Sequence, residues 1–195
     1  MSLNYLFIGL LVVILLWVIS VYNFFVTAKA RIKASIQEIG NQLKRQAELI
    51  PNLESSVKGY LKHEKAIFAD LTSARRAIAG ALKTGDVNKM AQAGSRLAAV
   101  LPSLQIAVED NPELKASDVV SNLMSELRDT ADKVMYARRL VIDLTADYNV
   151  KRVTFPSSIV AGIFNFMELP GLITPGEGEH LEVSGGETKA PKVNL

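Results

Sequence analysis

The stretch Tyr5–Val26 limits what this chain can fold into more than any other feature, because it holds no charged side chain. An α-helix rises about 1.5 Å per residue, so this stretch is long enough to cross the roughly 30 Å hydrocarbon core of a bilayer. A cleaved signal peptide would need a basic n-region and a small-residue cleavage site. Residues 1–4 have no charged side chain, and Tyr22-Asn-Phe-Phe ends the apolar run. We therefore predict an uncleaved transmembrane anchor over residues 1–27.

Basic side chains follow the predicted span, whereas none precedes it. This asymmetry favours a single-pass protein with its N-terminus outside and its body in the cytoplasm. Three basic residues close to the span are also expected to pair with anionic lipid headgroups, at about 1 kcal/mol each. These are Lys29, Arg31 and Lys33. Lys44 and Arg45 lie several turns further on, so we expect them to contact the next helix or another subunit.

Three aromatic residues are expected at membrane–water interfaces, although two of them could equally face the core. They are Tyr5, Trp17 and Tyr22.

Behind the span, apolar residues recur at three- and four-residue steps in four segments, as in helices that bury one face. The first two faces run Phe25, Ile32, Ile36, Ile39, Leu43, Ile50, with Lys29 and Gln46 in the seam, and Leu53, Val57, Tyr60, Ile67, Leu71, Ala74, Ile78. The clearest face repeats every ~3.5 residues, which is the period of a coiled coil. It runs Val120, Leu123, Leu127, Thr130, Val134, Ala137, Val141, Leu144, Tyr148. We predict an all-α fold, in which an N-terminal transmembrane helix continues into an antiparallel bundle of long, coiled-coil-like helices over residues 28–169.

Four residues mark expected boundaries within this bundle. Pro51 is expected to kink or break the first helix, and Pro102 to kink or divide the third, because proline removes a backbone donor. Gly85 is a good C-terminal stop, and Asp86 is a good N-cap for the helix that follows it.

An apolar patch at residues 155–169 follows the break at Phe155-Pro-Ser-Ser and is too short to span a bilayer. Three roles remain open for it: it closes the end of the bundle, lies on the lipid surface, or docks on a neighbouring subunit. Residues 170–195 are rich in Gly, Pro, Glu and Lys and are interpreted as a disordered tail.

Composition excludes several kinds of chemistry. The 22 Lys and Arg against 20 Asp and Glu give a formal net charge of only +2, so a nucleic-acid partner is not expected. The chain has no cysteine, and its two histidines are His63 and His180. His63-Glu64 begins like a zinc-protease motif, but residue 67 is isoleucine, so the second ligand is missing. We expect no catalytic residue, no cofactor and no metal.

Gly59 and Gly80 interrupt helical patterns, which close helix–helix approach would explain.

Several short sequence motifs in the chain resemble those of the LemA family. Between about Tyr22 and Phe166 they are, in order, Tyr22-Asn, Gln42-Leu-Lys-Arg, Leu49-Ile-Pro-Asn-Leu, Val57-Lys-Gly-Tyr, His63-Glu, Ala74-Arg, Pro112-Glu-Leu-Lys-Ala, Glu126-Leu, Ala137-Arg, Asp147-Tyr-Asn, Phe155-Pro and Ile159-Val-Ala-Gly-Ile-Phe. Residues Leu101–Ala107 align poorly, and Ile36, Gly40, Ala131 and Val141-Ile depart from the usual family residues. These departures suggest a divergent branch.

The resemblance implies a bacterial single-pass membrane protein with a long-helix bundle and no established catalytic activity. Some members belong to magnetosome membranes, and others are encoded near membrane proteases or stress-response proteins. Members with lipoprotein-type signals would carry their body outside the cytoplasm, so a periplasmic body stays open as the alternative.

Two functions therefore compete. The first is a non-enzymatic membrane scaffold that self-associates into a homo-oligomer through its helical faces and organises lipid or other membrane proteins. The second is an adaptor that presents clients to a membrane protease or signalling partner, with Lys58, His63 and Glu64 as part of the docking surface. The full set of candidate partner or oligomer contacts is Lys44, Arg45, Pro51, Lys58, Tyr60, His63, Glu64, Phe155, Phe164 and Phe166.

Overall fold

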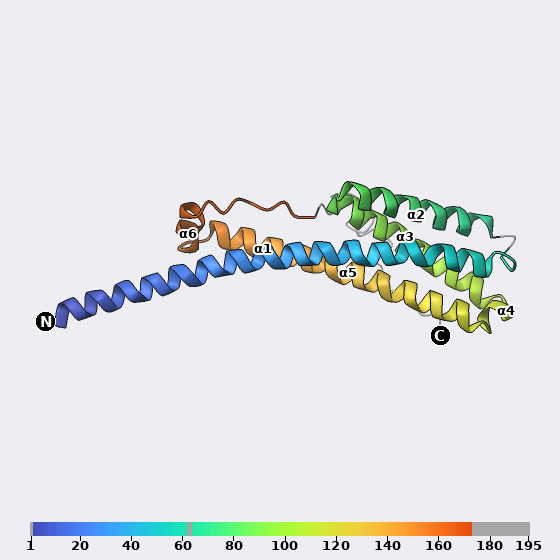
Figure 1. Cartoon of the computed structure of the whole chain (residues 1–195), viewed down its shortest axis with the longest axis horizontal. Helices are drawn as coiled ribbons and strands as arrows, with labels where there is room; N and C mark the ends of the chain where they lie inside the picture. Colours follow the sequence, from blue (N-terminus) through green and yellow to red (C-terminus); the bar gives the residue numbers. More distant parts are fainter. Residues whose placement is uncertain (1, 62–63, 173–195) are drawn as a thin grey trace, which may run out of the picture.

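The computed structural model describes residues 2–61 and 64–172, and these form helices joined by short connections (Figure 1). The helices are α1 (Ser2–Val57), α2 (Lys65–Thr84), α3 (Val87–Glu109), α4 (Pro112–Lys115), α5 (Asp118–Val153) and α6 (Ser157–Ile163). Since the described part of the chain contains no strand, the all-α prediction is confirmed.

Helix α1 continues without interruption from the apolar stretch into the body of the protein (Figure 1). Its N-terminal part projects alone, and its C-terminal part lies antiparallel to α5. The hairpin of α2 and α3 packs along this pair, so the four long helices alternate in direction. The predicted antiparallel bundle of long helices is therefore confirmed, with α1 as its longest element.

Two clusters of buried side chains hold the body together. The larger cluster runs along the bundle between α1, α2, α3 and α5 and includes Leu43, Leu71, Leu97 and Leu127, all fully buried. The smaller cluster lies where α1 leaves the body. Its buried members are Val21, Phe25, Ala28, Ile32, Tyr148, Val160 and Ala161.

The predicted apolar face of α5 is largely the observed one, because seven of its nine positions are buried. Leu123 and Leu144 are only half-buried, and the adjacent Met124 and Thr145 are buried instead. The shift by one position leaves the mean spacing unchanged, so the coiled-coil period describes the helix well.

The second predicted face is wrong in one place. It runs through Tyr60, but α1 ends at Val57 and α2 begins only at Lys65. The chain turns between them, so Leu61 is buried whereas the Tyr60 side chain is 50% exposed. A turn resets the helical period, and apolar spacing on either side of it carries no information about the residues within it.

Neither proline breaks its helix, since Pro51 lies inside α1 and Pro102 inside α3. Of the two outcomes expected at each proline, a kink or an interruption of the helix, the interruption does not occur. Pro51 leaves the carbonyl of Ala47 without its helical donor. Ile50 and Leu53 beside it are both fully buried, and this packing on both sides of the lost hydrogen bond keeps the helix intact.

The α2–α3 connection follows the sequence signals. Gly85 has φ 66°, and its N–H donates to the carbonyl of Ala81 over 3.0 Å. The Asp86 carboxylate accepts hydrogen bonds from the N–H groups of Asn88 at 2.9 Å and Lys89 at 3.1 Å. These contacts end α2 and begin α3 at the predicted residues.

Close helix approach occurs at a glycine other than the two expected. A methyl group on Gly59 or Gly80 would meet no atom within 4 Å, so that explanation of these glycines is wrong. A methyl group on Gly94 of α3 would lie 2.9 Å from Cγ1 of Val134 on α5. Gly94 is therefore the residue that lets α3 approach α5 so closely.

Part of the predicted tail is ordered against the body. Leu172 is half-buried and packs on the larger cluster, although it lies within the residues predicted to be a disordered tail. Residues 173–195 lie outside the described residues.

Candidate membrane interface

The projecting part of α1 is apolar and lies away from the bundle. Of the described helices, α1 is the one long and apolar enough to cross a membrane, with a mean hydropathy of 2.6 over its best 18-residue window. Only 6% of that window is buried within the protein. Val18 is the first residue to touch the smaller cluster, and Val21 is the first to be buried in it.

Helix α6 and the segment after it cap the body at the point where α1 leaves it (Figure 1). We call residues 155–169 the cap. Val160 and Ala161 of α6 are buried against α1, and the chain then returns along α5 as an extended segment. On its inward face the patch packs against the end of the bundle, as in the first of the three roles left open for it.

Aromatic side chains fix the position of the cap on α1. The ring of Phe25 stacks on that of Phe166 at 4.7 Å and meets that of Tyr148 edge-on at 5.2 Å, measured between centroids. The rings of Tyr22 and Phe164 lie 4.9 Å apart, also edge to face. Because Phe25 and Tyr148 come from different long helices, this cluster also fixes the register of α1 against α5.

Polar side chains of α5 tie down the extended part of the cap. The Tyr148 hydroxyl donates to the carbonyl of Met167 over 3.0 Å. Asn149 exchanges two hydrogen bonds with the backbone of Leu169, at 2.8 and 3.1 Å. Arg152 forms an ion pair with Glu168 at 3.0 Å. Tyr148 and Asn149, which belong to one of the motifs that resemble the LemA family, therefore have a structural role. Together with Arg152 they form what we call the α5 clamp, which holds the cap against α5.

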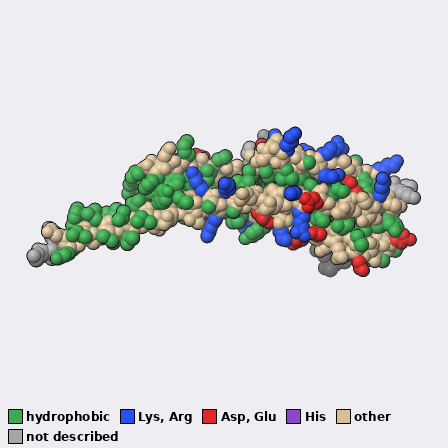
Figure 2. Space-filling model, viewed as in Figure 1, with side chains coloured by type: hydrophobic (Ala, Val, Ile, Leu, Met, Phe, Trp, Pro, Cys, Tyr) green, Lys and Arg blue, Asp and Glu red, His purple; other side chains and the backbone are tan. Residues whose placement is uncertain are grey.

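The outward face of the cap is apolar. Its exposed large side chains include one that is 78% exposed, Phe155, and one that is 73% exposed, Ile163. The others are Ile159, Phe164 and Met167. Figure 2 shows hydrophobic side chains continuing from the projecting part of α1 onto this end of the body. A contiguous exposed apolar surface of this kind indicates a contact with lipid or with another protein.

Basic side chains border this apolar surface on the side away from the projecting part of α1 (Figure 2). Lys29, Arg31 and Lys33 of α1 are exposed, as the interpretation as headgroup contacts requires. The Nζ atom of Lys29 lies 5.5 Å from the centroid of the Phe166 ring. Lys151 of α5 was not singled out from the sequence, yet its Nζ lies 5.0 Å from the centroid of the Phe24 ring. Only the antiparallel register, which sequence periodicity does not give, brings Lys151 beside α1.

A groove of about 500 Å³ runs between α1 and the end of α5 at the same level. Trp17, Val21 and Phe24 line it from α1, and Lys151 and Phe155 line it from the other side. Trp17 and Tyr22 thus lie beside the cap, whereas Tyr5 is exposed on the projecting part of α1. Of the three predicted interfacial aromatics, Tyr5 and Tyr22 lie near opposite ends of the apolar stretch, whereas Trp17 lies within it.

The predicted partner contacts fall into separate regions. Nε of Arg45 donates to Oε1 of Glu126 on α5 over 2.7 Å, so this side chain contacts a neighbouring helix of its own chain. That hydrogen bond, together with the charge of Glu126, raises the pKa of the Arg45 guanidinium. Lys44 is exposed, and Pro51 is half-buried within α1. Phe166 is half-buried in the aromatic cluster, which makes it an internal contact.

Lys58, Tyr60 and Glu64 lie in or next to the α1–α2 connection and are exposed. This connection is at the end of the body farthest from the projecting helix (Figure 1). His63 lies outside the described residues. The candidate partner residues are thus split between the two ends of the protein and do not form one site.

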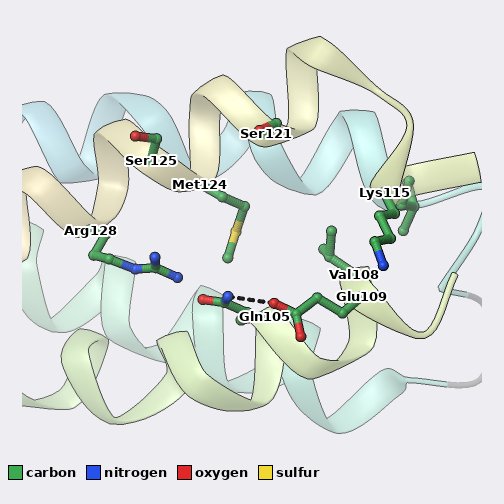
Figure 3. Close-up of a pocket in the computed structure, with 9 residues that line it drawn as sticks. Gln105, Val108, Glu109, Lys115, Ser121, Met124, Ser125 and Arg128 are labelled. Atoms are coloured by element: carbon green, nitrogen blue, oxygen red, sulfur yellow. Dashed lines mark hydrogen bonds between the residues drawn. The ribbon is translucent and has the colours of Figure 1, made fainter. Parts of the chain in front are cut away.

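A cleft of about 270 Å³ lies at this distal end between α3, α4 and α5 (Figure 3). Gln105 donates to Glu109 across 2.6 Å on one wall, and Arg128 and Lys115 extend toward the opening from opposite sides. Within residues 2–61 and 64–172, no group of three or more His, Asp or Glu side chains is placed to hold a metal ion.

The profile of the LemA family matches residues 35–193, which begin within the body part of α1 and include the α5 clamp and the whole cap. No curated protein matches the chain. The matched region is most of the chain and agrees with the helical bundle described above, so the protein belongs to the LemA family.

Proposed function

We propose that this protein is a non-enzymatic scaffold anchored in a bacterial inner membrane by the N-terminal part of α1, and that it self-associates through the flanks of its bundle. The observation that carries the proposal is the continuity of α1, which joins the apolar stretch and the bundle in one helix. A flexible linker would let the body reorient, whereas a continuous helix holds it in a fixed direction relative to the membrane.

A largely apolar groove on the bundle, with Gln105, Glu109, Arg128 and Asp132 also in its lining, supports self-association. The groove has a volume of about 580 Å³ and lies between α3 and α5. Leu101, Pro102 and Ile106 line it from α3, and Ala131 and Met135 line it from α5. Ile106 and Met135 are exposed in the single chain, and burying such side chains against a second copy is favourable.

The size of the detergent-extracted full-length protein tests this proposal. We expect an oligomer by light scattering, and we expect Met135→Glu to reduce its size because a charge cannot be buried without a partner. Val119→Glu is the matched control, since Val119 is on the same helix and is 61% exposed against 64% for Met135, but does not line the groove. A monomer at every concentration argues against self-association.

The adaptor function is favoured by a different observation, the exposure of Tyr60 at the distal end. A half-exposed tyrosine flanked by Lys58 and Glu64 has the chemistry of a protein docking site. The triple variant Lys58→Ala, Tyr60→Ala, Glu64→Ala separates the two functions. Loss of a crosslinked partner from a normally assembled protein supports the adaptor, and unchanged crosslinking argues against it.

The side of the membrane on which the body lies has a direct test. Because the sequence has no cysteine, the variant Lys83→Cys carries a single thiol, at the exposed end of α2. A membrane-impermeant maleimide added to intact spheroplasts should leave this thiol unlabelled if the body is cytoplasmic. Labelling would support the periplasmic alternative.

A further inference from the structure

The register of α1 against α5 places part of the body at the same level as the apolar stretch. Tyr148 of α5 lies beside Phe25, and α5 continues from there toward the N-terminus of α1. By Phe155 the chain has reached the level of Trp17, because both side chains line the same groove. The C-terminal end of α5 and the cap therefore lie alongside the last two turns of the uncharged stretch.

The thickness of a bilayer determines what this overlap means. Counted from Tyr5, where the uncharged apolar stretch begins, α1 rises only about 18 Å by Trp17. That falls short of the roughly 30 Å hydrocarbon core, and any tilt of the helix increases the length required. The remaining length comes from the segment between Val18 and Phe24, which the cap and the end of α5 accompany.

The surface chemistry at this level suits a lipid environment. The large exposed side chains of α6 and its flanks are apolar and include Phe155, Ile159 and Ile163. The exposed polar side chains of the cap, Asn165 and Glu168, lie in the segment after α6, where Glu168 is paired with Arg152 of α5. Phe155 and Trp17 line the same groove, whose charged lining residues are Asp147 and Lys151 of α5. Hydrophobic side chains continue from α1 onto the cap (Figure 2). Lys29 and Lys151 lie behind this apolar surface with their ammonium groups over aromatic rings, at the level where headgroup phosphates begin.

We propose that the cap is a second membrane contact: its apolar face enters the bilayer interface beside α1, and Lys29 and Lys151 meet anionic phospholipid headgroups. The bilayer is the occupant that this surface fits, because the surface is continuous with the helix that would cross it. A protein held in the membrane by both α1 and the cap resists rotation about the axis of α1. The inference depends on membrane anchoring by α1, and the experiment below separates the two.

Quenching of tryptophan fluorescence by lipid tests the contact in the full-length protein. Trp17 is the single tryptophan of the chain, so Trp17→Phe gives a background without one. Three reporters are placed in this background: Leu10→Trp in the apolar stretch, Ile163→Trp in the cap and Tyr60→Trp at the distal end. Each replaces an exposed large side chain, so the folds should be retained. The variants are reconstituted into phosphatidylcholine–phosphatidylglycerol vesicles that carry bromine on their acyl chains.

The expected result is loss of emission for the Leu10→Trp and Ile163→Trp reporters, with the Tyr60→Trp reporter unchanged. Quenching at Leu10→Trp alone would overturn the cap contact and leave the membrane anchor standing. Absence of quenching at all three would refute the anchor and the cap contact together. An Ile163→Trp emission that is not quenched by lipid but shifts with protein density would assign the surface to a second copy, which also overturns the proposal.

Headgroup chemistry gives a second readout. Replacing the phosphatidylglycerol with phosphatidylcholine should reduce quenching of the Ile163→Trp reporter, and Lys29→Gln with Lys151→Gln should remove that dependence on lipid charge. Lys83→Gln is the matched control, because Lys83 is an exposed lysine on α2 outside the cap. Equal quenching in both lipids would overturn the assignment of the two lysines.

Discussion

Gly94→Ala tests the close approach of α3 to α5 that stiffens the proposed scaffold. The added methyl carbon would lie 2.9 Å from Val134 Cγ1 and 3.5 Å from Leu43 Cδ2. Both neighbours are buried, and Val134 is β-branched, so its side chain has few alternative rotamers in a helix. The methyl group therefore fits only if the helices move apart.

Two opposing effects determine the magnitude. Replacing a glycine within a helix by alanine stabilises the helix by about 1 kcal/mol. Forcing an extra carbon into a packed core costs about 1–3 kcal/mol. The net expectation for Gly94→Ala is a decrease in the free energy of unfolding of up to about 2 kcal/mol.

Gly80→Ala is the matched control, because Gly80 is also inside a helix and its methyl group would meet no atom within 4 Å. The helix-propensity gain is common to both variants, so the difference between them isolates the overpacking cost of about 1–3 kcal/mol. Denaturant unfolding in detergent, followed by far-UV circular dichroism, gives both values. A Gly94→Ala protein as stable as the Gly80→Ala protein would refute the described packing of α3 on α5.

The double variant Gly94→Ala, Val134→Ala sharpens the same test. Removing the Val134 methyl groups makes room for the new carbon, so the double variant should be more stable than the sum of the single changes predicts. A coupling of about 0.5–3 kcal/mol is the range found for residues in contact. Additive effects would contradict the contact between these two residues.

Three further substitutions test single interactions. Gln46 is fully buried and neither polar atom of its amide has a hydrogen-bond partner, so Gln46→Leu should raise the free energy of unfolding by about 1–3 kcal/mol; an unchanged or lower value would show that the amide is satisfied. Tyr148→Phe removes the donor to the Met167 carbonyl, so stability should fall by about 1 kcal/mol and amide hydrogen exchange should rise in the cap; unchanged exchange would contradict the clamp. Arg45→Gln removes an exposed ion pair with Glu126, so the unfolding midpoint should fall slightly at low ionic strength and match the unsubstituted protein in high salt; a decrease that persists in salt would contradict screening.

Apolar periodicity predicted the parts of this fold that depend on local spacing. The buried face of α5 and the Gly85–Asp86 boundary follow from which residue types occur at which interval. Pro51 shows the limit of local reasoning. The hydrogen bond that proline removes can be read from the local sequence, but the burial of Ile50 and Leu53, which keeps the helix intact, depends on contacts with other helices. Gly94 shows the same limit, since only the partner side chain Val134 distinguishes it from Gly80.

The candidate membrane interface could be predicted only in part for the same reason. Lys29, Arg31 and Lys33 follow the apolar stretch in the chain, so their neighbourhood was visible from the sequence. Lys151 belongs to the same surface only through the packing of α5 on α1. The position of the cap likewise depends on the contact of Phe25 on α1 with Tyr148 on α5. The apolar spacing within either helix does not specify a contact between the two helices.

This dependence on register gives a test of the membrane geometry that leaves every described contact intact. Inserting seven residues of leucine and valine after Leu11 lengthens the projecting helix by about 10 Å, in nearly two whole turns. The direction in which α1 meets the body is thereby almost preserved, and no residue of the body or cap is changed.

With the insertion, the segment between Tyr5 and Trp17 holds about 20 residues and reaches the thickness of the hydrocarbon core without the cap. The apolar face of the cap and the two lysines should still hold the cap at the bilayer, so the longer helix should tilt and both Ile163→Trp and Leu10→Trp should stay quenched by brominated lipid. A scrambled replacement of seven existing residues, which keeps the length, is the control. Loss of quenching at Ile163→Trp alone would show that the length of α1, and not the affinity of the cap for lipid, places the cap at the membrane, and would contradict the second contact. The result therefore distinguishes a cap positioned by the length of α1 from one that draws the body to the bilayer independently.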